Sequence, residues 1–132
     1  MSESSISNHA RRAILSGYFF FTGICFASWA SRIPDIKLAL GLSDAQFGGM
    51  LLFLPMGSFI GIPISGSLTT RHGSNKMLKM ASILYPLALV NIGWAAGTFV
   101  WHLAIALFVF GMIGNLFNVS AVSYTHLTLP TN

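Results

Sequence analysis

Two asparagines in an apolar stretch near the end of the sequence are the first candidates for chemistry. Asn115 and Asn118 follow Gly111 and Gly114 at helical spacing, so on a helix all four share one face. An amide in hydrocarbon is costly unless it meets another helix or a watery cavity. Two interpretations stay open: the amides bind a hydroxyl-rich or amide-bearing solute, or they only hydrogen-bond neighbouring helices together.

Three further polar or aromatic residues complete a candidate substrate cavity with these asparagines: Ser28, Trp29 and Asn91. Trp29 either stacks on a sugar ring or anchors its helix at the outer membrane interface, and the anchor is favoured. Asn91 has the same two interpretations as the other asparagines. Arg32 is expected to reach lipid head groups or to pair with Asp35, rather than to bind an anion.

The sequence gives no support for catalysis. It shows no phosphate-binding loop, no pair of metal ligands and no nucleophile triad, so we expect no enzyme, no metal and no cofactor. Cys25 is the single cysteine, and we expect a small buried hydrophobe there. No Asp or Glu lies in the interior of an expected membrane span, so a buried proton-carrying carboxylate is missing from these helices.

The composition indicates that membrane-spanning segments position these residues. The chain has 132 residues, of which 54% are hydrophobic and only 8% charged, and its mean hydropathy is +0.71. Soluble domains have about a quarter of their residues charged, so the chain belongs to the membrane class. Its net charge of +4 comes from cations that flank apolar runs, which indicates contact with lipid head groups and not with nucleic acid.

The apolar runs predict an all-α membrane protein with four transmembrane helices. A bilayer crossing needs about 20 apolar residues, and the expected helices are 13–31, 44–68, 79–97 and 103–120. Residues 1–12 form a cytoplasmic tail, whose polar residues 1–9 are expected to be disordered. Pro34 should stop the first helix.

The second expected helix carries signals for its start and for its packing. Ser43 and Gln46 fit a capping box, so the helix should begin there. Gly57 and Gly61 form a small-xxx-small pair that lets another helix approach closely. We therefore expect this helix to pack within the bundle despite Pro55 and Pro63, because a bilayer favours internally hydrogen-bonded backbone.

A short basic turn, residues 66–78, separates the two helical hairpins. Five Lys or Arg residues lie on the same side of the expected membrane spans as this turn. Only Arg32 and Lys37 lie on the other side. The five are Arg11, Arg12, Arg71, Lys76 and Lys79. The positive-inside rule then places the N-terminus and the turn in the cytoplasm.

The turn resembles the loop between helices two and three of the major facilitator superfamily, roughly Gly-x-Leu-Ala-Asp-Arg-x-Gly-Arg-Lys-Arg-x-x-Leu. The matching residues, which the resemblance identifies as a cytoplasmic gating loop, are Gly66, Leu68, Arg71, Gly73 and Lys76. We expect Gly66 to permit close helix packing and Gly73 to adopt a positive φ. Thr70 stands where the family has an acid, which puts the usual gating charge network in doubt.

Three further segments are similar to the YbjJ-type branch of this superfamily, which is related in outline to fucose-permease-like sugar transporters. They are 27–34, with the sequence Ala-Ser-Trp-Ala-Ser-Arg-Ile-Pro, 40–48 and 111–119. The resemblance covers residues 13–120 and implies the N-terminal part of a twelve-helix secondary transporter in a bacterial inner membrane. It implies alternating access, a small sugar-like solute, and protons as a candidate coupling ion.

The last residues match a different pattern. Residues 122–131 correspond, in one reading frame, to a translated transposon-end adapter used in sequencing libraries. We therefore expect residues 121–132 to be a non-native tail and the chain to be an inactive fragment of a longer transporter. The alternative is a complete four-helix membrane protein, either a small multidrug exporter or a structural subunit. Such exporters depend on a Glu in helix one, which this sequence lacks.

Overall fold

The computed structural model describes residues 2–128, and the side chains of residues 8–124. Among these residues the chain forms helices and no strand. The helices are α1 (Ser2–Ser31), α2 (Ile33–Ala39), α3 (Asp44–Leu51), α4 (Phe53–His72), α5 (Ser74–Ala95) and α6 (Val100–Thr128). Four stretches are long and apolar enough to cross a membrane: Asn8–Ser31, Asp44–His72, Ser74–Ala95 and Val100–Tyr124. The prediction of an all-α membrane fold with four spans is confirmed.

The first span begins earlier than predicted and is followed by an extra helix. α1 starts at Ser2, so the expectation of disorder is wrong for residues 2–9, and residue 1 lies outside the described residues. Pro34 does end α1, but it also lies in the first turn of α2, where a missing N–H costs nothing. Lys37 of α2 then forms an ion pair with Asp44 at the start of α3.

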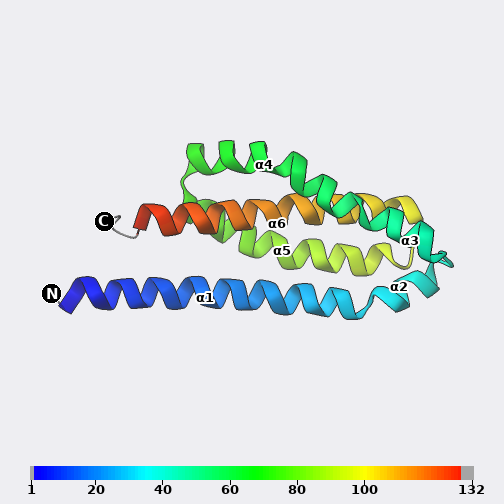
Figure 1. Ribbon diagram of the computed structural model, residues 1–132, viewed down its shortest axis with the longest axis horizontal. Helices are drawn as coiled ribbons and strands as arrows, with labels where there is room; N and C mark the ends of the chain where they lie inside the picture. The colour runs from blue at the N-terminus through cyan, green and yellow to red at the C-terminus, as the bar shows by residue number, and fades with distance from the viewer. Residues whose placement is uncertain (1, 129–132) are drawn as a thin grey trace.

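The second span starts as predicted but is broken near its beginning. The capping box is confirmed: the Ser43 hydroxyl accepts from the Gln46 N–H at 3.2 Å, and the Gln46 side chain accepts from the Ser43 N–H at 3.0 Å. The span predicted over 44–68 is confirmed as one membrane-crossing stretch, Asp44–His72, but a turn at Leu52 divides it into α3 and α4. Pro55 explains the break, since it cannot bond the carbonyl four residues earlier and its ring crowds that carbonyl. α4 continues through Pro63 to His72 and bends along its length (Figure 1).

The third and fourth spans form a hairpin with boundaries that differ from the prediction. α5 begins at Ser74 instead of 79 and carries Pro86 inside it. α6 begins at Val100 and continues to Thr128, beyond the predicted end at 120. The helix can extend because the first proline after it is residue 130. Residues 129–132 of the expected tail lie outside the described residues.

The two hairpins pack through α6. In Figure 1, α4 runs along one side of α6 and α5 along the other, while α1 lies beyond α5. A Cβ at Gly57 would stand 2.0 Å from the Phe108 carbonyl oxygen, and one at Gly61 would stand 3.1 Å from the Met112 Cα. The close approach predicted for this glycine pair is therefore confirmed, with α6 as the partner.

Two other glycines refine this picture. Gly111 of α6 faces α4 from the opposite side, since its Cβ would lie 2.1 Å from the Leu54 carbonyl oxygen. Gly66 has no described atom within 4 Å of its Cβ position, so the expectation of close packing is wrong there. The glycines therefore allow the closest backbone approach in the middle of the span, and nearer the basic turn α4 and α6 also meet where the Thr69 and Ser120 hydroxyls lie 3.3 Å apart.

α1 attaches to the other helices mainly through aromatic rings. Tyr18 and Phe19 contact Phe117 of α6 edge-on, with ring centroids 6.1 and 6.0 Å apart. Trp29 lies 6.2 Å from the ring of Phe110, which also packs on Tyr85 of α5. Cys25 is buried, as predicted.

Candidate functional site

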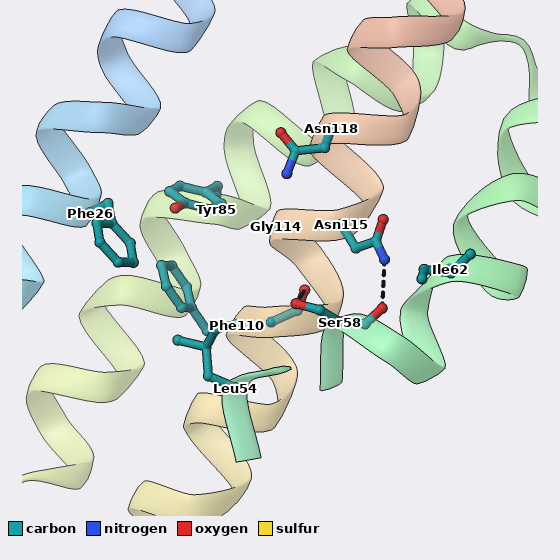
Figure 2. A pocket seen from close by; sticks show the side chains of 10 residues that line it. Phe26, Leu54, Ser58, Ile62, Tyr85, Phe110, Gly114, Asn115 and Asn118 are labelled. Atoms are coloured by element: carbon teal, nitrogen blue, oxygen red, sulfur yellow. Dashed lines mark hydrogen bonds between the residues drawn. The ribbon is translucent and has the colours of Figure 1, made fainter. Parts of the chain in front are cut away.

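A cavity of about 400 Å³ lies among the four spans, and Figure 2 shows it from close by. α1, α4 and α5 each contribute at least one side chain, and α6 supplies one whole wall. The lining residues are Phe26, Leu54, Ser58, Ile62, Tyr85, Phe110, Gly111, Gly114, Asn115 and Asn118. No Asp, Glu, Lys, Arg or His is among them, so the described wall of the cavity is uncharged and combines apolar surface with a few polar groups.

Asn115 ties α6 to α4. Its Nδ2 donates to the Ser58 carbonyl oxygen at 2.5 Å, and the Ser58 hydroxyl donates in return to the Gly111 carbonyl oxygen at 3.0 Å (Figure 2). The glycines at the crossing make these bonds reachable, because they bring the two backbones close together. For Asn115 the geometry matches the interpretation of an amide that holds helices together.

Asn118 is in a different situation, although it lies only one turn further along the same face. Its side chain is exposed in the cavity wall and has no hydrogen-bond partner among the described residues. Tyr85 lies across from this face, with a ring carbon 3.5 Å from where a Cβ on Gly114 would stand. A free amide beside an aromatic ring offers a donor and an acceptor to a solute. This geometry matches the solute-binding interpretation.

The remaining predicted cavity residues lie elsewhere. Asn91 contacts His102 at 3.3 Å, and His102 contacts Thr98 at 2.8 Å, so these three form a polar chain across the turn between α5 and α6. Ser28 and Trp29 line a second hollow, between α1 and α5. The five candidates are therefore divided among three places, and only Asn115 and Asn118 share the large cavity.

Trp29 does not lie exposed at a membrane interface. Only 6% of its surface is exposed, and it packs between Phe26 and Phe110. The favoured anchoring role is therefore wrong for Trp29. Trp94 and Trp101 are instead the exposed tryptophans, each 73% exposed, on either side of the turn between α5 and α6.

Six lining residues were missed by sequence reasoning: Phe26, Leu54, Ser58, Ile62, Tyr85 and Phe110. A signal existed for Ser58, because it follows Gly57 and continues the run of small residues toward α6. No local signal distinguishes Phe26 from the exposed phenylalanines around it, or Tyr85 from any other apolar position of α5. Their role depends on which helix faces which.

The basic turn is built around Gly73, which ends α4 and starts α5. Its φ of +83° and ψ of 143° lie in a region that favours glycine, as expected. Leu68 packs against the buried cluster at this end of the bundle. Arg71 and Lys76 are exposed, and neither has a carboxylate within 4 Å among the described side chains.

Thr70, at the position where the family pattern has an acid, bonds only its own helix. Its hydroxyl lies 3.1 Å from the Gly66 carbonyl oxygen and 2.9 Å from that of Ser67. The hydroxyl therefore satisfies carbonyls of α4 and offers no negative charge to Arg71. The turn lies at the same end of the bundle as the N-terminus, opposite α2 and the turn between α5 and α6 (Figure 1). The five cations and the two cations counted in the sequence therefore lie at opposite ends.

Comparison with known proteins found relatives that are named as membrane proteins. The chain is 34% identical over 113 residues to an uncharacterized transporter, y4wD, of Sinorhizobium fredii, covering 86% of this chain and 29% of that protein. It is 33% identical over 104 residues to an uncharacterized MFS-type transporter of Yersinia pestis, covering 77% and 26%. It is 33% identical over 90 residues to the membrane protein MosC of Rhizobium meliloti, covering 68% and 22%.

These relatives confirm the resemblance to transporters, one of them MFS-type, and none of the three is named as an enzyme. The chain spans less than a third of the length of each. No profile of a known protein family matches the chain. No solved structure is significantly similar to it.

Proposed function

We propose that this chain is the N-terminal part of a major facilitator superfamily transporter, which carries a small solute across a bacterial inner membrane by alternating access. Residues 13–120 would supply the first four of about twelve helices, with the N-terminus in the cytoplasm. The relatives named as transporters support the family, and the four membrane spans support a multi-pass protein in a lipid bilayer.

The observation that carries the proposal is the unpaired Asn118 amide in a cavity among four membrane spans. An amide in that position is costly unless it meets water or a solute. Asn115, one turn earlier, is already bonded to Ser58, so Asn118 is not needed for the same contact between α4 and α6. A polar side chain in a membrane span that bonds no described residue is a candidate for binding a solute.

The lining also favours one class of solute. Without a charged residue in the described wall, the cavity suits a neutral molecule better than an ion. Phe26, Tyr85 and Phe110 supply aromatic surface, and Asn118 supplies a donor and an acceptor for hydroxyl groups. A sugar or sugar-like solute fits this combination. If protons drive the transport, the group that carries them lies outside these helices.

The basic turn is proposed to act in gating. Gly66, Leu68, Arg71, Gly73 and Lys76 match the family pattern, and the exposed cations can hold the turn at anionic head groups. Since Thr70 replaces the acid and bonds its own helix, Arg71 must find any charged partner in the rest of the transporter.

Uptake by the full-length transporter tests the proposal. The protein read from the source gene is reconstituted in liposomes and offered a panel of labelled neutral sugars and, for comparison, sugar phosphates. We expect uptake of at least one neutral sugar above that of empty liposomes, and we expect Asn118→Leu to abolish it. Phe59→Leu, on the exposed face of α4, is the control and should transport normally. Uptake that is unchanged in Asn118→Leu would contradict the assignment of the cavity.

A further inference from the structure

The second hollow is separate from the proposed solute cavity. It has a volume of about 210 Å³ and lies where α1 and α2 meet α5. Ser28, Trp29 and Arg32 line it on the α1 side, and Leu89 and Val90 line it on the α5 side. It shares no lining residue with the cavity of Asn118.

Trp29, which lines this hollow, has an unsatisfied hydrogen-bond donor. Its Nε1 is buried and has no acceptor among the described residues. A buried donor without a partner costs about 1–3 kcal/mol. Tryptophan N–H groups usually find an acceptor when they are buried. No described residue supplies an acceptor for this N–H.

Arg32 adds an unpaired positive charge to the same hollow. Its side chain is exposed, and no carboxylate lies within 4 Å of it among the described side chains. Asp35 lines an adjoining hollow together with Arg32, but the two form no ion pair. Ser28 lies one helical turn before Arg32 and adds a hydroxyl. The hollow thus collects a cation and donors without a lining acid, which is the chemistry of an anion site.

The depth of these groups in the membrane indicates which class of ligand fits the hollow. The span of α1 ends at Ser31, so Arg32 lies at the level of the lipid head groups. Leu89 and Val90 form an apolar wall, and Val90 is 66% exposed. A cation at one end of the hollow and an apolar wall beside it match an anionic amphiphile better than a free ion.

We propose that this hollow binds one anionic phospholipid. Its phosphate pairs with the Arg32 guanidinium, the Trp29 N–H donates to an oxygen of the head-group region, and an acyl chain lies along Leu89 and Val90. The lipid would supply the acceptor that Trp29 lacks within the described chain. It would also cover part of α1, whose aromatic contacts leave much of its apolar surface exposed.

Native mass spectrometry of the whole chain with phosphatidylglycerol tests the proposal. We expect one retained lipid per chain, and we expect Arg32→Gln to bind it at least about fivefold more weakly. Arg12→Gln, at the opposite end of α1, is the matched control and should bind like the unaltered chain. Equal binding by the Arg32→Gln and Arg12→Gln variants would overturn the proposal. Circular dichroism confirms that each variant is folded.

Trp29 fluorescence gives a second readout that does not depend on removing Arg32. In a Trp94→Phe, Trp101→Phe background, a phospholipid brominated on its acyl chain should quench Trp29, and unbrominated phosphatidylglycerol should compete. Inorganic phosphate should not displace the lipid. Displacement by inorganic phosphate would assign the site to free phosphate and overturn the lipid proposal, as would an absence of quenching.

Discussion

Replacing Gly57 by alanine should drive α4 and α6 apart. The new Cβ would stand 2.0 Å from the Phe108 carbonyl oxygen, whereas ordinary contacts of a Cβ are at 3.4 Å or more. The obstacle is backbone, which cannot rotate away as a side chain can. The two helices must therefore separate by about 1.4 Å at this point, and the neighbouring contact at Gly111 loosens with them.

This displacement lowers the free energy of unfolding through two effects. Overpacking a tight contact typically costs about 1–3 kcal/mol. Separation also lengthens the Asn115–Ser58 hydrogen bond, which contributes about 0.6 kcal/mol if it is typical of membrane proteins. The better helix propensity of alanine returns at most about 1 kcal/mol. We therefore expect Gly57→Ala to lower the free energy of unfolding by about 1–3 kcal/mol.

Reversible unfolding in mixed detergent and sodium dodecyl sulfate micelles, followed by circular dichroism, measures this loss. Gly66→Ala is the matched control on the same helix, because nothing lies within 4 Å of its Cβ position. That variant should be as stable as the unaltered chain or more stable by up to about 1 kcal/mol. Equal stabilities of the Gly57→Ala and Gly66→Ala variants would refute the close packing of α4 against α6.

Three further predictions concern the asparagines, the capping box and the topology. Asn115→Ala should lower the free energy of unfolding by about 0.5–2 kcal/mol, while Asn118→Ala should leave it unchanged, and equal losses in the same assay would contradict their different roles. Ser43→Ala should cost about 1 kcal/mol through loss of the cap on α3, and Ser31→Ala is a control because its hydroxyl bonds only the Ser28 carbonyl. Alkaline phosphatase fused after Gly41 should be active and after Gly73 inactive in cells, and the reverse pattern would overturn the orientation.

Sequence alone predicted the features that depend on local chemistry. The capping box at Ser43 needs only a hydroxyl and an amide three residues apart, and the positive φ of Gly73 needs only a turn that no other residue type favours. The approach of another helix to Gly57 and Gly61 was also predictable, because their spacing puts both on one face. The identity of the approaching helix was not.

The turn at Leu52 is an interruption that the general rule for helices in a bilayer did not predict. A bilayer does favour helical backbone, and α4 runs through Pro63 without interruption. Pro55, however, cannot donate an N–H to the Leu51 carbonyl, and α3 ends at that residue. The break appears before Pro55 because proline disturbs the carbonyl four residues earlier.

The candidate site was harder to predict because neighbouring residues on one face have different partners. Asn115 and Asn118 are equivalent in sequence, yet only Asn115 lies opposite the Ser58 carbonyl. Ser28 and Trp29 were grouped with them because all are polar or aromatic in apolar runs. Their separation into another hollow depends on how α1 packs against α5, which no local pattern encodes.

Water access to Asn118 is the most direct test of the solute cavity. Asn118→Cys is prepared in a Cys25→Ser background, in membranes, and is treated with a membrane-impermeant thiol reagent. Phe59→Cys, on the exposed apolar face of α4, is the control. We predict that the thiol at 118 reacts much faster than the thiol at 59, and that a transported sugar slows the reaction of the full-length protein. Equal and negligible labelling at both positions would show that Asn118 faces no watery path and would contradict the proposed role of this chain in transport.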